Sequence, residues 1–330
     1  MSGIRRREFL LLGGGAAAWP LAARAQQAGK LPVIGLLSSR SPATDVPLIT
    51  VMREGLNETG LVEGRNFTTD YRSAEGQYDR LASLAADLVH RQVTVIVAIG
   101  GEPAALAAKT ATATVPIVFA GGTDPVRSGI VANLNRPGGN ITGVSAFQIE
   151  LEPKKLGLLR ELRPNTATIA VLVNPNFAYA EMQVNDIKAA ARSVGQQIDL
   201  LSASTIREID AAFTRLAQMR ADALLIATDP FFFTRAAQLV VLATRHAIPT
   251  LYHRREFVTI GGLISYGSNT EEVYRALGVY AGRVLKGEKP GDLPIQLPTK
   301  FELVINLSTA KALGIDVPAT LLARADEVIE

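Results

Sequence analysis

In four of the loops that follow apolar runs, a polar residue is followed directly by proline, namely Glu102, Asp124, Asn174 and Asp229. A residue before proline is kept out of helical geometry, and proline itself suits the first position of a helix. We therefore expect these four side chains at strand-to-helix corners, where each one either caps a helix or faces a ligand. Ser38 follows the first apolar run at a similar corner.

Two of these side chains, Asp124 and Asp229, could in principle form an acid–base pair. The sequence lacks the motifs that usually accompany catalysis: no glycine-rich nucleotide loop follows the first strand, and no G-x-S-x-G occurs. It has no cysteine, and no two of its three histidines are spaced as a helical metal pair. We therefore expect no enzymatic activity, cofactor or metal, and keep an exported α/β enzyme using Asp124 and Asp229 as the alternative.

Aromatic residues are a further group of candidates. Phe231, Phe232 and Phe233 are adjacent and cannot all face one side of a helix. One of them is expected either to line a pocket or to pack against a neighbouring helix. Tyr252 and His253 end a later apolar run, where an aromatic side chain either meets a ligand or packs between lobes.

Apolar runs of strand length alternate with amphipathic stretches of helical spacing along the chain. The expected strands are 33–37, 67–71, 93–99, 117–120, 141–145, 169–173, 197–201, 223–227, 250–252 and 301–306. The expected helices are 46–59, 78–91, 103–112, 153–162, 179–194, 206–219, 232–246 and 270–286. Strands that are apolar almost throughout and alternate with helices predict parallel sheets covered on both faces.

The two halves of the chain echo each other, because an apolar strand precedes a hydrophobic-proline pair in each, at 115–116 and 248–249. We predict an α/β fold of two doubly wound, Rossmann-like lobes with a ligand cleft between them. The N-terminal lobe is expected to hold residues 31–145 and about 270–300. The C-terminal lobe is expected to hold residues 146–269 and about 301–330.

The formal charge of +3 belongs to the first 25 residues, which hold four arginines and one glutamate and leave 30 basic and 30 acidic residues elsewhere. A neutral body gives no reason to expect a nucleic-acid partner. Arg6-Arg7, a short apolar stretch and Ala23-Arg24-Ala25 predict a twin-arginine signal peptide over residues 1–25. Cleavage near Ala25 would release the chain into the periplasm with Gln26 first.

Several short blocks carry a resemblance to a known family. They are GLVEGRN (60–66), YR (71–72), AEG (74–76), RPGGNITG (136–143), VNP (173–175), TDP (228–230), REF (255–257) and GGLISYG (261–267). With these blocks the chain resembles the substrate-binding proteins of ABC transporters that have the type I periplasmic fold. Within them it is similar to the branch of tryptophan/tyrosine or general amino-acid binders.

The resemblance implies a solute-binding protein that closes its lobes around a small polar or zwitterionic solute. Its expected partners are an ABC permease and ATPase, and it is expected to be a monomer. A sensory domain of a signalling system is the other alternative on this fold. The implied ligand contacts are Ser38, Gly101, Glu102, Thr123, Asp124, Asn174, Asp229 and Tyr252. Glu102 and the pair His253-Arg254 depart from the family pattern and alter the charge of the pocket.

Overall fold

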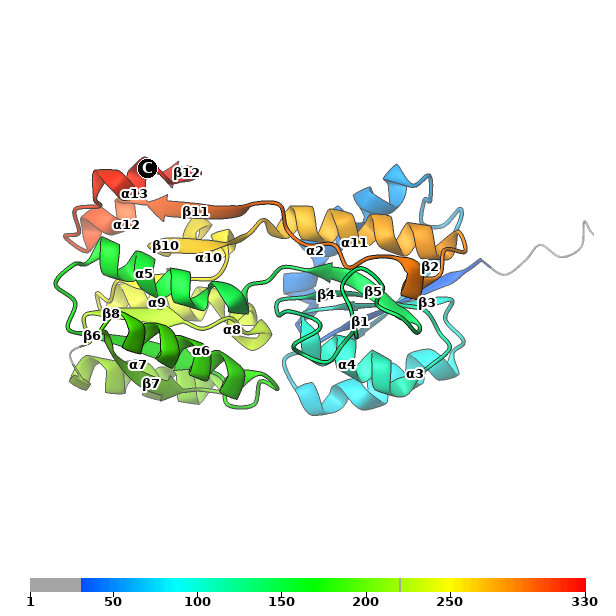
Figure 1. The fold of residues 1–330 in the computed structure, drawn as a ribbon, viewed down its shortest axis with the longest axis horizontal. Helices are drawn as coiled ribbons and strands as arrows, with labels where there is room; N and C mark the ends of the chain where they lie inside the picture. The colour runs from blue at the N-terminus through cyan, green and yellow to red at the C-terminus, as the bar shows by residue number, and fades with distance from the viewer. Residues whose placement is uncertain (1–30, 220) are drawn as a thin grey trace, which may run out of the picture.

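The computed structural model describes residues 31–219 and 221–330, so the predicted signal peptide lies outside the described residues. The chain folds around two separate β-sheets that lie side by side (Figure 1). Within the described residues, no helix is both long and apolar enough to cross a membrane.

The five-stranded sheet is parallel, with strand order β2-β1-β3-β4-β5. Its strands are β1 (Val33–Ser38), β2 (Thr68–Ser73), β3 (Val95–Ile99), β4 (Ile117–Gly121) and β5 (Ile141–Ser145). One face packs against α2 (Pro42–Glu58) and α11 (Thr270–Leu285). The other face packs against α3 (Leu81–His90), which follows the short helix η1 (Tyr78–Arg80), and against α4 (Glu102–Ala111). We call this sheet with its helices the N-terminal lobe.

The seven-stranded sheet has the order β12-β11-β10-β9-β8-β6-β7. Its strands are β6 (Thr168–Val173), β7 (Gln197–Ser202), β8 (Ala223–Ile226), β9 (Thr250–Tyr252), β10 (Ile264–Ser268), β11 (Phe301–Asn306) and β12 (Glu327–Ile329). Alternate residues of β6 face opposite layers. One layer holds α5 (Glu152–Leu162), which follows η2 (Ile149–Leu151), α6 (Ala180–Ser193), α12 (Leu307–Ala312) and α13 (Ala319–Leu322). The other holds α7 (Ile206–Met219), α8 (Pro230–Thr234), α9 (Ala236–Arg245) and α10 (Arg255–Thr259). We call this sheet with its helices the C-terminal lobe.

Two local features differ from the sequence-based expectation. β11 pairs antiparallel to β10, so the second sheet is mixed rather than wholly parallel. The single helix expected over 232–246 is two helices, because Arg235 has φ −111° and ψ 18° and ends α8 before α9 begins. This break lets the buried α8 lie at the lobe interface while α9 packs on the sheet.

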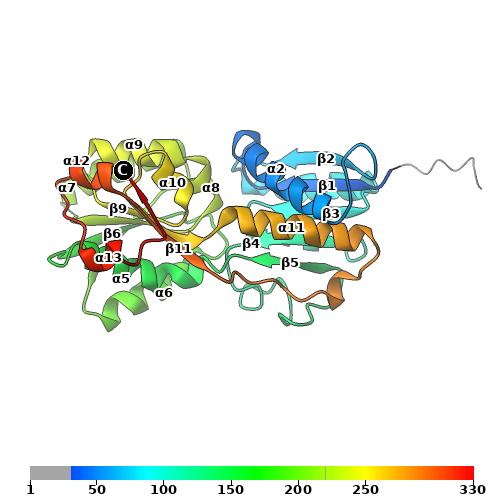
Figure 2. The ribbon, with the colours of Figure 1, turned by 90° about the horizontal axis from the view of Figure 1, so that it is seen from above.

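Three segments connect the lobes: the chain after β5, the chain after β10, and the extended stretch that follows η3 (Pro290–Asp292) and leads to β11 (Figure 2). α11 comes after most of the C-terminal lobe in the sequence but packs on the N-terminal sheet. On this basis we propose lobe boundaries as expected above, with residues 31–145 and 270–300 in one lobe and 146–269 and 301–330 in the other.

α2 and α11 approach each other unusually closely. A Cβ atom added at Gly278 would lie 1.9 Å from the Met52 carbonyl oxygen, and one added at Gly55 would lie 2.0 Å from the Arg275 carbonyl oxygen. Only glycine permits such a backbone contact. The close packing against α2 therefore holds α11 in the N-terminal lobe.

Candidate functional site

A cavity of about 40 Å³ lies between the lobes and is lined from both of them. The N-terminal lobe contributes Arg40, Gly101, Glu102 and Tyr274, and the C-terminal lobe contributes Thr228, Asp229, Phe233, His253 and Arg254. Gln148 in the connection after β5, Ser268 at the end of β10 and Thr270 at the start of α11 complete the polar part of the wall. Of the residues predicted from the sequence, Gly101, Glu102 and Asp229 therefore lie on this cavity.

Glu102 begins α4 but does not cap it, because Gly101 occupies the N-cap position with φ +97°. Its side chain is buried, and Oε1 accepts hydrogen bonds from the backbone N–H groups of Gly122 at 2.5 Å and Thr123 at 2.6 Å. The carboxylate thus fixes the loop after β4 and presents negative charge to the cavity.

Asp229 caps α8, as the proline pattern predicts. Its Oδ1 accepts from the backbone N–H groups of Phe231 at 2.9 Å and Phe232 at 3.2 Å, and from Asn174 Nδ2 at 3.1 Å. Its Oδ2 accepts from the hydroxyl of Tyr78 in the opposite lobe at 3.1 Å. Burial raises the pKa of Asp229 to about 6, although these hydrogen bonds act in the other direction.

Asp124 and Asn174 do not precede helices, so the corner geometry expected for them is wrong. Asp124 Oδ1 accepts from the N–H of Val126 at 2.8 Å, and Asn174 Oδ1 accepts from the N–H of Asn176 at 3.0 Å. Both close short turns of the kind that Asp and Asn side chains favour. Asp229 lines the cavity and Asp124 does not, so the structure does not bring the two carboxylates to one site.

Ser38, Thr123 and Tyr252 are buried but are also absent from the cavity wall. Ser38 Oγ accepts from the N–H of Arg40 at 3.0 Å. Thr123 Oγ1 is buried without a hydrogen-bond partner among the described residues. Tyr252 stacks on Phe257, with ring centroids 4.7 Å apart, in the apolar core. Direct contact of these residues with a ligand stays a prediction.

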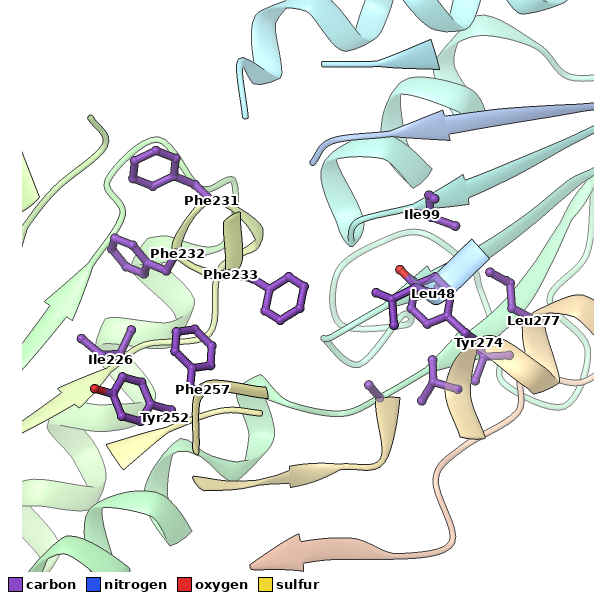
Figure 3. Packing of buried hydrophobic residues seen from close by; sticks show 14 of the residues in the cluster. Leu48, Ile99, Ile226, Phe231, Phe232, Phe233, Tyr252, Phe257, Tyr274 and Leu277 are labelled. Atoms are coloured by element: carbon purple, nitrogen blue, oxygen red, sulfur yellow. The ribbon is translucent and has the colours of Figure 1, made fainter. Parts of the chain in front are cut away.

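Phe233 resolves the question of the three phenylalanines. It points from α8 toward Leu48 and Tyr274 of the N-terminal lobe, whereas Phe231 and Phe232 point elsewhere (Figure 3). All three belong to an apolar cluster that runs through both lobes. Phe233 therefore lines the cavity and also joins the two hydrophobic cores.

Arg40 is a cavity residue that sequence reasoning missed. It follows β1, is fully buried, and pairs with Asp45 at 2.8 Å. Nη2 also donates to the Tyr274 hydroxyl, and Asp45 in turn accepts from the Tyr71 hydroxyl at 2.7 Å. Its one signal in the sequence is an arginine two residues after a buried strand.

His253 and Arg254 follow β9 and also line the cavity. Burial, with the nearby charges of Arg254 and Lys155, lowers the pKa of His253 well below its usual value, so its ring is neutral. Arg254 Nη1 donates to Thr270 Oγ1 at 3.0 Å. From the sequence we expected this pair only to alter the charge of the pocket.

A buried ion pair lies next to the cavity and contacts residues that line it. Lys155 and Glu152 are fully buried, with Nζ 3.4 Å from Oε1. Lys155 Nζ also donates to the Gln148 carbonyl at 3.0 Å and to Thr228 Oγ1 at 2.9 Å. Burial lowers the pKa of Lys155. The pair therefore fixes one connecting segment and one cavity residue together.

The lobes are closed on each other in this structure. Tyr78 reaches Asp229, the Tyr179 hydroxyl donates to the Ser128 carbonyl at 3.0 Å, and Arg127 pairs with Asp186 at 2.6 Å. Within residues 31–219 and 221–330, no group of three His, Asp or Glu side chains is placed to hold a metal ion. The site is therefore a cavity between the lobes with hydrogen-bond donors and acceptors from both of them, which suits binding by closure.

Comparison with known proteins gives a consistent family assignment. The "Tyrosine-binding protein" of Clostridioides difficile is 29% identical over 260 residues, which are 79% of this chain and 74% of that protein. A domain solved in complex with L-Trp from Streptococcus pneumonia is 29% identical, with a TM-score of 0.79 over 90% of this chain and 100% of that one. A ligand-free, open substrate binding protein from Clostridium difficile is 26% identical, with a TM-score of 0.64 over 91% and 99%.

The model of the family described as "ABC transporter substrate binding protein" matches residues 43–329. The chain therefore belongs to the ABC transporter substrate binding protein family, whose members bind a solute outside the cytoplasm for a membrane transporter rather than catalyse a reaction.

Proposed function

We propose that this chain captures a small zwitterionic solute, an amino acid or a related compound, and delivers it to an ABC permease with its ATPase. The observation that carries the proposal is the interlobe cavity, which has the carboxylate of Glu102 on one lobe and the guanidinium of Arg254 on the other. An ammonium and a carboxylate on one small molecule match these two walls. The names of the tyrosine- and tryptophan-binding relatives support the same solute class.

Lobe closure is the proposed mechanism. The closed arrangement places polar groups from both lobes around one cavity, so a solute that contacts both walls binds the closed form more tightly than the open one. Such a solute shifts the population toward closure by the difference between its two affinities. The permease then receives a form of the protein that the free open state does not present.

The test is calorimetric titration of the mature chain with single amino acids, beginning with L-tyrosine, L-tryptophan and L-phenylalanine. The single tryptophan, Trp19, lies in the predicted signal peptide, so fluorescence of added L-tryptophan is free of tryptophan background. Reversible binding with unchanged solute is expected. Chemical conversion of the solute would favour the enzyme alternative, and failure of every amino acid to bind would reject this solute class.

We propose twin-arginine export and cleavage near Ala25, which leave a monomeric chain with Gln26 first in the periplasm. Replacing Arg6 and Arg7 with lysine should leave the precursor in the cytoplasm. Fractionation and N-terminal sequencing measure this outcome. Normal periplasmic delivery of the double variant would reject the twin-arginine route.

A further inference from the structure

Arg254 is a partly buried cation that makes no salt bridge within the described residues. Nη1 donates to Thr270 Oγ1, while Nε is enclosed and has no hydrogen-bond partner among the described residues. Across residues 31–219 and 221–330, no carboxylate lies within 4.0 Å of its guanidinium. A buried charge with unmet donors is costly unless something else supplies the acceptor.

The groups around Arg254 carry charges of both signs. The carboxylate of Glu256, two residues further on, attracts Arg254 and has a buried Oε2 without a partner among the described residues, but it does not lie within 4.0 Å of the guanidinium. Arg40, from the opposite lobe, lies with its Cζ 5.4 Å from the centre of the Phe233 ring, and Arg254 Cζ lies 4.9 Å from the same centre. The two Cζ atoms are therefore at most about 10 Å apart in the closed form and repel each other. His253 is beside them with Nδ1 buried and unpartnered among the described residues.

Neither of the two carboxylates that line the cavity forms a salt bridge with Arg254. Glu102 is directed by two backbone N–H groups of the loop after β4. Asp229 already accepts four hydrogen bonds from the chain, including that of Tyr78. No carboxylate of the described residues thus pairs directly with Arg254, and a carboxylate of the solute would supply that partner, since a guanidinium pairs best with a planar, two-oxygen anion.

Building on the proposed function, we propose that Arg254 binds the carboxylate of the solute, with Arg40 of the opposite lobe facing the same anionic end. The carboxylate relieves the repulsion between the two arginines, so it favours closure as well as binding. The ammonium end of an amino acid then faces Glu102. Arg254 is thus a specificity-determining residue that selects carboxylates over their neutral amides.

Acetate and acetamide are the probes, because they are small, share a shape and differ in charge. Thermal unfolding is measured with each probe, with sodium chloride holding the sodium concentration constant. Acetate should stabilise the wild type and acetamide should not. Arg254→Gln should weaken acetate binding at least about tenfold, the effect of one lost charge-assisted bond.

Arg65→Gln is the matched control, because Arg65 is exposed on the surface of the N-terminal lobe; it should keep the full acetate response. Arg254→Lys keeps the charge but not the planar fork and should respond weakly, and it replaces the Gln variant if that protein does not fold. Equal effects of acetate and acetamide on the wild type, or an acetate response in the Arg254 variants equal to that of the wild type, would overturn the assignment.

The two proposals fail separately. Amino-acid binding that is unchanged in Arg254→Gln would leave the proposed function standing and remove Arg254 from it. Acetate binding through Arg254 with no response to any amino acid would keep the carboxylate site and reject the solute class.

Discussion

Asp229 combines two roles at one residue. It caps α8 through Oδ1, and through Oδ2 it accepts the hydroxyl of Tyr78 from the other lobe. Because α8 carries Phe233 into the cavity, the cap also fixes the position of an aromatic wall. A change in the charge of this carboxyl therefore affects both the cap of α8 and the hydrogen bond to Tyr78 of the other lobe.

The ionisation of Asp229 should make stability depend on pH. Its folded-state pKa of about 6 exceeds the unfolded value of about 3.9, so the folded protein binds more protons between these pH values. Stability conferred by this group is present at low pH and is lost as pH rises toward 6. Between pH 4 and pH 7 the wild type should lose about 2–3 kcal/mol relative to Asp229→Asn, which still caps but does not titrate.

Urea unfolding of both proteins at pH 4, 5.5 and 7 measures that difference. A constant gap between wild type and Asp229→Asn across the three pH values would mean that the carboxyl ionises at its ordinary pKa.

Sequence patterns located some of these residues and could not locate others. The proline pattern marked Glu102 and Asp229 because a local backbone restriction places them. The same pattern at Asp124 and Asn174 gave turns instead, although each side chain accepts from the N–H two residues on, as Asp229 also does, so this local bond does not decide whether a helix follows. The signals for Arg40 and Arg254 are weak, because an arginine in a loop is usually solvated and only tertiary packing brings these two to the cavity.

At the scale of elements, the tightest contact is the crossing of α2 and α11. The strands and main helices were predictable within a few residues, because apolar runs and helical spacing are local properties. β10 was not predicted as a strand, and its antiparallel pairing with β11 joins segments separated by the whole of α11. Long-range pairing of this kind leaves no periodic trace in either segment.

Gly278→Ala should destabilise the protein by at least about 1–3 kcal/mol, the usual cost of overpacking a close contact. The new Cβ would meet the Met52 carbonyl of α2, and backbone atoms of two packed helices cannot move aside cheaply. Thermal or urea unfolding measures the loss.

Gly157→Ala is the matched control within α5. Gly157 is exposed, and nothing lies within 4 Å of a Cβ added there, so alanine should leave stability unchanged or raise it by up to about 1 kcal/mol. Equal effects of the two substitutions would show that the crossing of α2 and α11 is looser than described.

At the scale of the molecule, Tyr78 is a polar contact between the lobes. Its hydroxyl donates to Asp229 Oδ2 and accepts from the N–H of Phe231, both at 3.1 Å. Other contacts between the lobes include the half-exposed pair Arg127–Asp186, which contributes little in water. The balance between open and closed forms should therefore respond to Tyr78.

Tyr78→Phe should favour the open form and weaken solute binding by about tenfold or more, because it removes two hydrogen bonds that form only on closure. Small-angle scattering should show a larger radius of gyration than for the wild type. Tyr280→Phe is the control, because that hydroxyl donates to the Pro294 carbonyl at 2.8 Å and not to the other lobe. Identical scattering and affinity of the two variants would exclude Tyr78 as a closing contact.

The late position of α11 in the sequence has a consequence for synthesis. All five strands of the N-terminal sheet exist once residue 145 has been translated, but α11 is complete only at residue 285. At roughly 5–20 residues per second, the ribosome needs about 7–28 s to add that segment. Through that interval the apolar surface that α11 covers is exposed on the nascent chain. We therefore expect the incomplete protein to bind chaperones, and we expect stalled translation in this interval to favour aggregation.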